Sequence, residues 1–443
     1  MAKKNDTGVS LCMIGTGYVG LVSGACLAEM GNRVVCVDNN EEKIKMLRKG
    51  VMPIYEEGLK ELVDRNVRAK RLFFAGSIRE GMLHGGRRAE AVFIAVGTPP
   101  REDGSADLSA IERVSQEIAR NMTAYTVIVE KSTVPAETCL WIEKTVNRFN
   151  KKKIPYDVCS NPEFLREGGA IEDFLSPDRI VLGVPSKNAE ALLRKVYSAL
   201  KKYPVLATDV KSAELIKHAS NSFLSTKISF INAVANVCEK TGADVEAVAK
   251  GMGLDRRIGP AFLKAGIGFG GFCFPKDLEA FYWLSNQKGY DFELLKNVKE
   301  INEAQKNWVV KKVEEELWNL EGKTVAFLGL AFKPLTDDMR FAPSIDIAEK
   351  LVSRGARIKV YDPVSMPNAK KVMKNVYFAK NEYDCVKDSD CVCLITEWKR
   401  FGELDFNKVL KLVRHPILID GRNLYDPAKM RALGFTYKSV GRQ

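Results

Sequence analysis

LCMIGTGYVGLVSGACLAEMGNRVVCVD, from Leu11 to Asp38, is the stretch that decides the fold. It opens on an apolar run of strand length, which leads into Gly15, Gly17 and Gly20 in G-x-G-x-x-G spacing. A helical pattern follows, and a second strand-like run ends at the acidic residue. Glycines at these positions allow the backbone to approach a pyrophosphate, whose charge the helix N-terminus stabilises. The stretch therefore predicts a dinucleotide-binding βαβ unit.

Asp38 indicates which dinucleotide this unit would take. An acidic side chain at the end of the second strand accepts hydrogen bonds from ribose hydroxyls. The next residue is Asn39, whereas a 2′-phosphate would be accommodated by an arginine nearby. The motif therefore predicts NAD rather than NADP as the cofactor. The alternative is a glycine turn that binds nothing.

Strands and helices alternate along both ends of the chain. Apolar runs alternate with helical patterns in the first half and again from Lys323, whereas the segment from Asp209 to Ile301 is helical throughout. No proline or glycine interrupts the apolar spacing until Gly242, which predicts one helix of roughly seven turns. Alternating strands and helices favour parallel sheets. The predicted class is α/β, with two doubly wound Rossmann-like domains joined by a long central helix and an all-helical middle domain, and with domain limits at 1–208, 209–300 and 301–443.

Composition narrows the class of protein. The formal net charge is +12, but the basic residues are scattered and form no RNA-binding signature, so we expect attraction of a small anionic substrate and no binding of nucleic acid. The apolar runs are of strand length and fall short of the roughly 20 residues of a membrane span, so no membrane partner is expected. The opening residues, MAKKNDTG, contain no apolar leader, which predicts a cytoplasmic protein.

One of the ten cysteines stands apart from the others. In GIGFGGFCFPKD, at Gly266–Asp277, Cys273 follows a glycine-rich turn, and Phe274 and Pro275 are predicted as the N-cap and first residue of a helix. A helix N-terminus and a neighbouring lysine favour the thiolate, so a nucleophile is predicted; a cysteine packed beside the turn is the alternative. Seven cysteines in strand-like or helical runs are predicted to be buried apolar side chains of a reducing compartment, with no metal site: Cys12, Cys26, Cys36, Cys139, Cys238, Cys391 and Cys393.

Polar residues four positions apart form two further candidate pairs. Glu163 and Glu167 in NPEFLREG are predicted to share a helical face, as are Lys217 and Asn221 at the start of the long helix. A carboxylate, an ammonium and an amide near a thiolate supply the general base and the oxyanion donors of acyl-enzyme chemistry. Each pair alone also fits a solvated helix face.

Further candidates lie where predicted strands end, at the edge where open α/β sheets bind ligands. Thr98 in VGTPP and Thr133 in KSTVP follow strands of the first half, and are hydrogen-bonding candidates or simple turn caps. Lys333, Asp362 and Arg422 follow strands of the last part of the chain. The two cations suit a phosphorylated ligand, and isolated surface cations are the alternative.

The series of motifs resembles the nucleotide-sugar 6-dehydrogenase family, of the UDP-glucose and GDP-mannose dehydrogenase type. The resemblance runs almost end to end and rests on these segments in order: GTGYVGL, VGTPP, KSTVP, NPEFLREG, AELIKHASNSFLSTKISFIN, GIGFGGFCFPKD, LAFKPLTDDMR, YDP, TEW and DGRNL. It implies that a primary alcohol, C6 of the sugar of UDP-glucose, is oxidised twice by NAD to the acid.

The family's mechanism assigns roles to the candidate residues. By this resemblance Cys273 attacks the intermediate aldehyde to give a thiohemiacetal, and oxidation then yields a thioester. Lys217 and Asn221 would stabilise the oxyanion, and Asp277 would help a water or Lys217 take the first proton. Glu167 or Glu163 would support thioester hydrolysis, and Thr133 would position water.

The resemblance also implies binding residues and a homodimer formed through the central helix, about Val210 to Lys240. Arg340 would touch the NAD pyrophosphate, and Arg422 resembles an arginine that reaches a neighbouring subunit's site. The other implied cofactor-binding residues are Gly15, Gly17, Tyr18, Val19, Gly20, Asp38, Lys43, Thr98, Thr133 and Glu167. The other implied substrate-binding residues are Phe164, Leu165, Arg166, Lys217, Asn221, Arg257, Phe262, Lys264, Gly270 and Lys333.

One residue departs from the family's pattern. The family has a small residue before the cysteine, and this chain has Phe272. The ring would either reshape the sugar pocket or point into the core. The endings FPKD and TEW favour UDP-glucose; GDP-mannose or a UDP-N-acetylhexosamine, and a nucleotide-binding protein without turnover, remain the alternatives.

Overall fold

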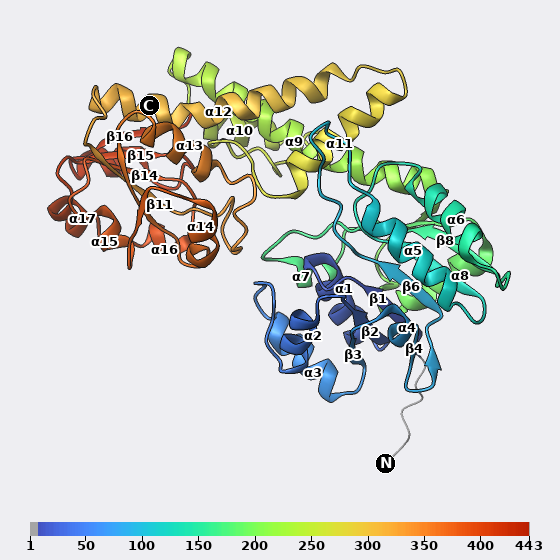
Figure 1. The fold of residues 1–443 in the computed structure, drawn as a ribbon. Coiled ribbons are helices and arrows are strands. Elements are labelled where there is room, and N and C mark those ends of the chain that lie inside the picture. Colours follow the sequence, from blue (N-terminus) through green and yellow to red (C-terminus); the bar gives the residue numbers. More distant parts are fainter. Residues whose placement is uncertain (1–7, 443) are drawn as a thin grey trace. The chain divides into compact units, whose positions relative to one another are not determined.

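The computed structural model describes residues 8–442, and the opening MAKKNDT that bears on localisation lies outside them. The chain divides into two compact units, the first ending at Ser220 and the second beginning at Asn221 (Figure 1). Each unit contains its own sheet and its own core. The predicted α/β class is confirmed.

The first unit contains an eight-stranded sheet in the order β10-β9-β8-β7-β6-β1-β2-β3. Alternate residues of β1 face opposite sides: Leu11 and Met13 pack into one apolar cluster, Cys12 and Ile14 into another. Helices cover both faces, as a parallel sheet requires (Figure 1). The strands are β1 (Ser10–Ile14), β2 (Arg33–Val37), β3 (Leu72–Ala75), β6 (Ala91–Ile94), β7 (Thr126–Glu130), β8 (Tyr156–Ser160), β9 (Ile180–Gly183) and β10 (Val205–Thr208).

The first sheet departs from the parallel arrangement that the sequence favoured at one pair, because β8 and β9 are antiparallel where Ser160 lies opposite Gly183. Only one short helix, α7 (Ala170–Leu175), joins them. At 1.5 Å per residue it extends about 9 Å, less than the roughly 16 Å of a five-residue strand. It therefore does not return the chain to the start of β8, as a parallel crossover would.

The helices of the first unit lie between these strands. A small antiparallel hairpin, β4 (Leu83–His84) with β5 (Arg87–Arg88), stands apart from the main sheet. The helices are α1 (Tyr18–Glu29), α2 (Glu41–Arg48), α3 (Leu59–Arg68), α4 (Ile78–Met82), α5 (Ser109–Asn121), α6 (Thr138–Phe149) and α8 (Lys187–Val196).

The second unit contains a six-stranded parallel sheet in the order β13-β12-β11-β14-β15-β16. Six neighbouring strands of the first sheet, β3-β2-β1-β6-β7-β8, have the same doubly wound order. The strands are β11 (Thr324–Leu328), β12 (Arg357–Tyr361), β13 (Val376–Phe378), β14 (Cys391–Leu394), β15 (Ile417–Asp420) and β16 (Thr436–Ser439). The helices between them are α13 (Pro343–Val352), α14 (Met366–Val372), α15 (Glu382–Val386), α16 (Lys399–Gly402), α17 (Phe406–Leu412) and α18 (Pro427–Ala432).

The predicted long helix is α9 (Val210–Thr241), and the division between the units falls within it. Its 32 residues make about nine turns, so the expected seven was too few. It stops before Gly242, whose φ of 80° is unfavourable for other residues. Three helices follow: α10 (Val245–Gly253), α11 (Cys273–Gln287) and α12 (Glu293–Leu317). The limits 1–208, 209–300 and 301–443 stay a prediction, and α12 runs across the second of them.

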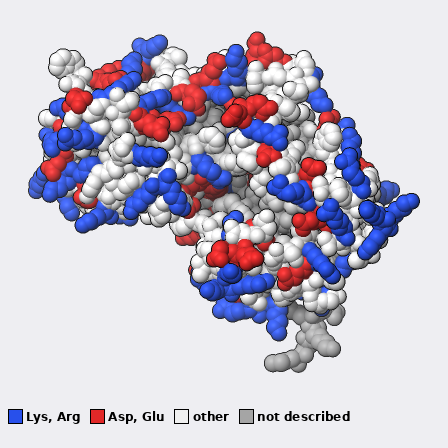
Figure 2. Space-filling model, viewed as in Figure 1, with Lys and Arg blue, Asp and Glu red and all other residues white. Residues whose placement is uncertain are grey.

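No helix in the described part of the chain is long and apolar enough to cross a membrane. On the face shown in Figure 2, lysine and arginine are mixed with aspartate and glutamate and form no continuous basic stripe.

Candidate functional site

The glycine turn of the first unit is built for close backbone approach. Gly15 has a φ of 102°, and a Cβ there would lie 2.4 Å from the Ala95 oxygen. A Cβ on Gly20 would lie 2.0 Å from the Gly15 oxygen, so both glycines are required by packing. Gly17 differs, because it is the N-cap of α1 and a Cβ there would meet nothing within 4 Å. The space beside Gly17 therefore fits a pyrophosphate at the helix N-terminus.

Asp38 lies next to this turn, as predicted. Its Oδ2 accepts hydrogen bonds from Thr16 N at 3.0 Å and Thr16 Oγ1 at 2.7 Å, and its Oδ1 accepts one from Asn40 N at 2.9 Å. Burial alone would raise the pKa of Asp38, but these hydrogen bonds and Lys43 Nζ at 3.8 Å lower it. The carboxylate is thus ionised at neutral pH and suited to accept from ribose hydroxyls.

Two threonines meet at the same end of the sheet. Thr98 is buried, and its Oγ1 donates a hydrogen bond to the Thr133 carbonyl oxygen at 2.9 Å. This bond joins the segment after β6 to the segment after β7. The Thr98 hydroxyl therefore fixes the shape of this edge.

The segment NPEFLREG is a loop, so the predicted helical face shared by Glu163 and Glu167 is wrong. Glu163 is buried, and its Oε1 lies 2.9 Å from Lys217 Nζ of α9. Its Oε2 accepts a hydrogen bond from Leu165 N at 2.5 Å, and Lys217 Nζ also lies 5.4 Å from the centre of the Phe164 ring. The buried Glu163 carboxylate needs these donors. The loop conformation provides them, whereas a helix would place them elsewhere.

The end of this loop is attached to the glycine turn. Glu56, which the sequence analysis missed, accepts hydrogen bonds from Tyr18 Oη, from Gly168 N at 2.7 Å and from Ala170 N at 2.7 Å. Val19 follows Tyr18 in α1, and both pack against the apolar cluster that contains Leu11 and Met13. Arg166 is exposed and paired with Asp173 at 2.6 Å. Glu167, the next residue, is half-buried.

In the second unit, Cys273 is exposed, while the other nine cysteines are buried. It is the first residue of α11, and Phe272 is the N-cap. The predicted start at Phe274 and Pro275 was therefore two residues late, because a proline is also tolerated within the first turn of a helix. The backbone N–H groups of that turn favour a thiolate on Cys273.

A buried polar group lies one turn along α11. Asp277 Oδ2 accepts a hydrogen bond from Asn221 Nδ2 of α9 at 2.6 Å, and Asp277 Oδ1 lies 2.7 Å from Lys276 Nζ. All three side chains are buried. Lys217 lies one turn before Asn221 on α9, so the predicted spacing of these two is confirmed as helical.

Buried amides hold the glycine loop that precedes Cys273. Asn302 of α12 accepts from Phe269 N at 2.8 Å and donates to the Phe269 oxygen at 3.0 Å. Asn232 of α9 accepts from Gly266 N at 2.9 Å. A Cβ on Gly270 would lie 2.2 Å from the Phe341 oxygen, so Gly270 serves the close approach of two backbones. Neither asparagine was predicted from the sequence. Asn232 is a buried polar residue within the predicted long helix, whereas Asn302 follows directly after the segment predicted as helical.

Arg422 extends toward the same loop within its own unit. Its guanidinium is buried and donates to the oxygens of Ile395 at 2.8 Å, Gly268 at 3.1 Å and Phe332 at 3.4 Å. Burial lowers the pKa of Arg422. The ordinary pKa of an arginine is so high that the side chain still stays charged at neutral pH. These bonds tie the segment after β15 to the glycine loop, and its predicted role in a neighbouring subunit's site stays a prediction.

Arg340 lies over the Phe272 ring, at 4.2 Å from its centre, and Lys276 Nζ lies 5.6 Å from it. Arg340 is also paired with Asp338 at 2.6 Å. The Phe272 ring is half-buried beneath these two cations. Of the two expected orientations, it therefore does not point into the apolar core.

The remaining predicted substrate residues are spread over the second unit. Arg257 is exposed and paired with Asp255 at 2.6 Å, and Lys264 is exposed. Phe262 lies near α11, with its ring centre 6.1 Å from that of Phe274. Lys333 is half-buried, with its Nζ 5.9 Å from the centre of the Phe332 ring.

Asp362 does not repeat the role predicted for Asp38. It is buried and accepts hydrogen bonds from Leu330 N at 2.8 Å, Ser365 N at 2.8 Å and Trp398 Nε1 at 3.1 Å. These bonds saturate its oxygens, so it supports the turn after β11 and leaves no acceptor for a ribose.

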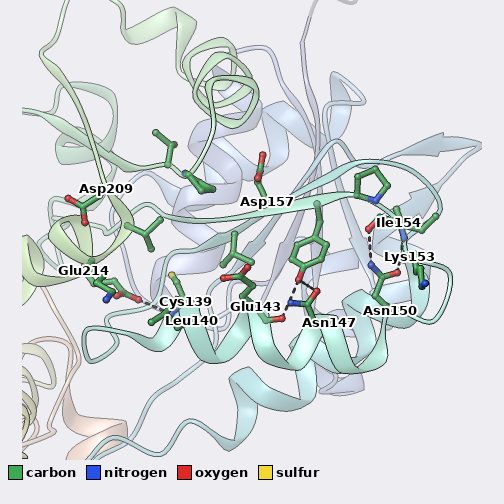
Figure 3. Close-up of a pocket in the computed structure, with 17 residues that line it drawn as sticks. Cys139, Leu140, Glu143, Asn147, Asn150, Lys153, Ile154, Asp157, Asp209 and Glu214 are labelled. Carbon is green, nitrogen blue, oxygen red and sulfur yellow. Dashed lines mark hydrogen bonds between the residues drawn. The ribbon is translucent and has the colours of Figure 1, made fainter.

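A cavity of about 880 Å³ in the first unit lies apart from the predicted site residues (Figure 3). It lies between α6, the start of β8 and the start of α9, where Glu214 accepts hydrogen bonds from Glu137 N at 2.7 Å and Cys139 N at 2.8 Å. Tyr156 Oη donates to Asn147 Oδ1 at 2.7 Å along its wall. Asn150 Nδ2 donates to the Ile154 oxygen at 2.7 Å further along the same wall.

A dinucleotide turn, a second sheet of the same winding and an exposed thiol on a helix N-terminus define a nucleotide-binding oxidoreductase. Three family models match the chain: the NAD binding domain of the UDP-glucose/GDP-mannose dehydrogenase family at residues 9–201, its central domain at 211–304 and its UDP binding domain at 326–427. The chain belongs to this family, and its cofactor is NAD.

Relatives and solved structures agree with this assignment. The chain is 45% identical to UDP-glucose 6-dehydrogenase TuaD of Bacillus subtilis over 98% of its length and 93% of that protein, and 44% identical to UDP-glucose 6-dehydrogenase of Pseudomonas aeruginosa over 98% and 97%. A UDP-glucose dehydrogenase from the archaeon Pyrobaculum islandicum superimposes with a TM-score of 0.92 at 38% identity, over 100% of both chains. A UDP-D-ManNAc dehydrogenase from Pyrococcus horikoshii gives 0.85 at 25% identity, over 98% and 99%.

Proposed function

We propose that this protein oxidises C6 of UDP-glucose twice with NAD and so forms UDP-glucuronate. The observation that carries the proposal is Cys273, the exposed thiol at the first residue of α11. A four-electron oxidation passes through an aldehyde, and a covalent bond to the enzyme keeps that aldehyde from escaping. Bound NAD supplies the hydride acceptor at both oxidations.

The steps balance as follows. The C6 alcohol loses a hydride and a proton to become the aldehyde. The Cys273 thiolate adds to the aldehyde and the oxygen takes a proton, which gives a thiohemiacetal. Loss of a second hydride and a proton gives a thioester. Water then cleaves the C–S bond, which releases the carboxylic acid and restores the thiol. One sugar thus yields two NADH.

The polar residues divide the proton chemistry. Lys217 takes the proton of the alcohol, and Asn221 donates to the oxygen that becomes negative. Glu163 is occupied by Lys217 and Leu165 N, so it orients Lys217. We assign activation of the hydrolytic water to Glu167, with Thr133 positioning that water and Asp277 orienting Asn221.

UDP-glucose is proposed as the substrate because relatives at 44–45% identity are UDP-glucose 6-dehydrogenases. The residues that would hold UDP-glucose are Phe164, Leu165, Arg166 and Gly270, together with the cations Arg257, Lys264, Lys333 and Arg422. GDP-mannose and UDP-N-acetylhexosamines are the competing substrates, since Phe272 lies beside the thiol and alters the wall around it.

We also propose a homodimer that forms through α9. Phe223, Phe230 and Val237 are 65%, 52% and 58% exposed on this helix, and each follows the previous one by seven residues. Seven residues are nearly two turns, so the three form one apolar stripe that a second copy of the helix would cover. The free thiols of all ten cysteines fit a cytoplasmic location, which is reducing.

The test is the stoichiometry of NADH with UDP-glucose under limiting sugar. We expect two NADH per UDP-glucose and an acid product, and much lower kcat/KM for GDP-mannose and UDP-N-acetyl sugars. Faster turnover of another nucleotide sugar would transfer the same chemistry to that substrate. Binding of NAD and UDP-glucose without NADH would show a protein without turnover.

A further inference from the structure

The glycine loop that precedes Cys273 is held by the segment that contains Arg340. Gly271 N donates a hydrogen bond to the Arg340 oxygen at 3.0 Å, and a Cβ on Gly270 would lie 2.2 Å from the Phe341 oxygen. Gly271 has a φ of 78°, and glycine adopts positive and negative φ with similar ease. The conformation of the loop therefore depends on contacts that other segments make with it.

The side chain of Phe272, the next residue, provides a second contact with the same arginine. The guanidinium carbon of Arg340 lies 4.2 Å from the centre of the Phe272 ring, where a cation is attracted to the face of the ring. Asp338 fixes this guanidinium, because its carboxylate accepts hydrogen bonds from Arg340 Nε at 2.9 Å and from Nη2 at 2.6 Å. Arg340 thus holds Gly271 through its backbone oxygen and Phe272 through its side chain.

The ring of Phe272 also contacts a cation of α11 itself. Phe272 is the N-cap of this helix, and Lys276 follows four residues later on the same face. Lys276 Nζ lies 5.6 Å from the centre of the Phe272 ring, and the residue is 5% exposed. A buried ammonium needs partners that offset its loss of water. The ring therefore adds to the stabilisation that Lys276 receives from Asp277 Oδ1 at 2.7 Å.

From Lys276 the contacts continue to a group that the proposed reaction uses. Asp277 Oδ1 faces Lys276 Nζ, whereas Asp277 Oδ2 accepts the hydrogen bond from Asn221 Nδ2 at 2.6 Å. Both oxygens belong to one carboxylate, so a movement of Lys276 changes the position of Asp277 and of its bond to Asn221. The Phe272 ring is therefore adjacent to Cys273 along the chain and connected to Asn221 through printed side-chain contacts.

We propose that Phe272 is a positioning residue, whose ring binds Arg340 and Lys276 and thereby fixes the first turn of α11 for the reaction at Cys273. The inference rests on the proposed function, in which Cys273 bonds to the aldehyde and Asn221 donates to the negative oxygen. An aliphatic side chain at this position fills space but has no ring face to attract the two cations. The departure from the family's small residue thus orders the reactive turn as well as altering the wall beside the thiol.

Loss of the ring face should affect the chemical steps more than binding. Phe272→Leu keeps apolar bulk beside the thiol, so UDP-glucose meets a similar surface. The first turn of α11 then adopts further arrangements, and a small misplacement of reacting groups costs rate. A less ordered turn also aligns its N–H groups less well, so it favours the thiolate of Cys273 less.

The experiment compares Phe272→Leu with Phe272→Tyr, which retains the ring face, and with a matched control, Phe378→Leu. Phe378 of β13 is also half-buried and also has a lysine near its ring, Lys370 at 5.8 Å, but it belongs to another element. Three quantities are measured for each folded variant: kcat and KM for UDP-glucose, the rate at which iodoacetamide labels Cys273, and the melting temperature.

We expect Phe272→Leu to lower kcat about fivefold, which corresponds to the loss of about 1 kcal/mol from a cation–π contact. KM for UDP-glucose should change by less than about twofold, since the apolar bulk is kept. Labelling of Cys273 should slow about threefold. Phe272→Tyr and Phe378→Leu should retain both rates. Unchanged rates in Phe272→Leu, or an equal loss in Phe272→Tyr or in the control, contradict the inference.

A second comparison tests whether Arg340 is a partner of the ring. Phe272→Leu is introduced into an Arg340→Leu protein, where it should slow labelling of Cys273 less than it does in the wild type. An equal effect in both proteins contradicts the inference. If Phe272→Leu does not fold, Phe272→Met replaces it throughout, because methionine is also apolar and has no ring.

The two possible failures are distinguishable, because labelling of Cys273 requires no substrate. A wild-type protein that makes no NADH from any nucleotide sugar would overturn the proposed function. Slower labelling in Phe272→Leu would still support the action of the ring on the first turn of α11, and unchanged labelling would contradict it whatever the turnover.

Discussion

At the residue scale, the surroundings of a thiol decide what it does. Cys139, Cys159 and Cys385 lie in the cores, where burial raises the pKa of each thiol. Such thiols stay protonated and act as small apolar side chains. Cys273 has the same chemistry in an exposed position at a helix N-terminus. Position in the fold therefore separates the proposed nucleophile from the packing residues.

A thiol-alkylation experiment tests this difference. Under native conditions iodoacetamide should label Cys273 first, and labelling should abolish acid formation while NAD binding remains. Cys273→Ala should lose at least 1,000-fold in kcat, on the order of the loss of a catalytic nucleophile. Cys238→Ala, a buried control on α9, should keep both activity and the labelled site. Preferential labelling of another cysteine, or an active Cys273→Ala variant, would exclude the thioester route.

At the element scale, the turn between β1 and α1 separates packing from ligand binding. Gly20 is required because the backbone of Gly15 lies against it, whereas Gly17 borders open space. Gly17 has a φ of −72° and a ψ of −170°, which alanine also adopts. The two glycines of one motif thus serve different purposes.

Alanine substitutions should show this division. Gly17→Ala should melt near the wild-type temperature but bind NAD at least tenfold more weakly, because its methyl group occupies the space of the pyrophosphate. Gly20→Ala should destabilise the first unit by about 2 kcal/mol or more, since its Cβ meets a backbone oxygen. Both quantities come from thermal melts with and without NAD. Equal melting temperatures for the two variants, with unchanged NAD binding in Gly17→Ala, would contradict this interpretation.

Element by element, the sequence predicted what depends on local pattern. The strands of the sheet centres, such as β1 and β11, are long apolar runs and were identified. All four edge strands, β3, β10, β13 and β16, were missed because each has only three or four residues, too few for apolar length or alternation to mark it. The loop at Glu163 was predicted as helix because four-residue spacing is a helical signal, whereas its contact with Lys217 is 54 positions away in sequence.

The candidate site was predicted unevenly for the same reason. Cys273, Lys217 and Asp38 stand in recognisable motifs. The structure places Cys273 at the first residue of α11, Lys217 beside Glu163 and Asp38 beside Thr16, and their roles stay predictions. Asn232 and Asn302 act through contacts with segments more than 25 residues away, at Gly266 and Phe269. Only the tertiary structure brings such pairs together, so periodicity could not identify them.

At the scale of the whole molecule, the exposed stripe on α9 is a feature that a single chain leaves unexplained. Phe223, Phe230 and Val237 would each be about 10.5 Å from the next along a helix that rises 1.5 Å per residue. Exposed phenylalanines in a repeated pattern mark an interaction surface rather than scattered surface residues. A second α9 offers the same stripe, so two copies related by a twofold axis would cover both.

A charge within the stripe tests whether α9 forms the dimer. Phe230→Glu places two carboxylates in the proposed interface, where burial without a partner is unfavourable. We expect light scattering after size exclusion to give about 99 kDa for the wild type, twice the 49.4 kDa of one chain, and the mass of one chain for the variant. Leu206→Glu, at a residue 50% exposed on β10, should remain dimeric. Because α9 also carries Lys217 and Asn221, the dissociated variant should lose turnover as well as mass. A Phe230→Glu protein that keeps the wild-type mass would show that this stripe is not the contact between copies.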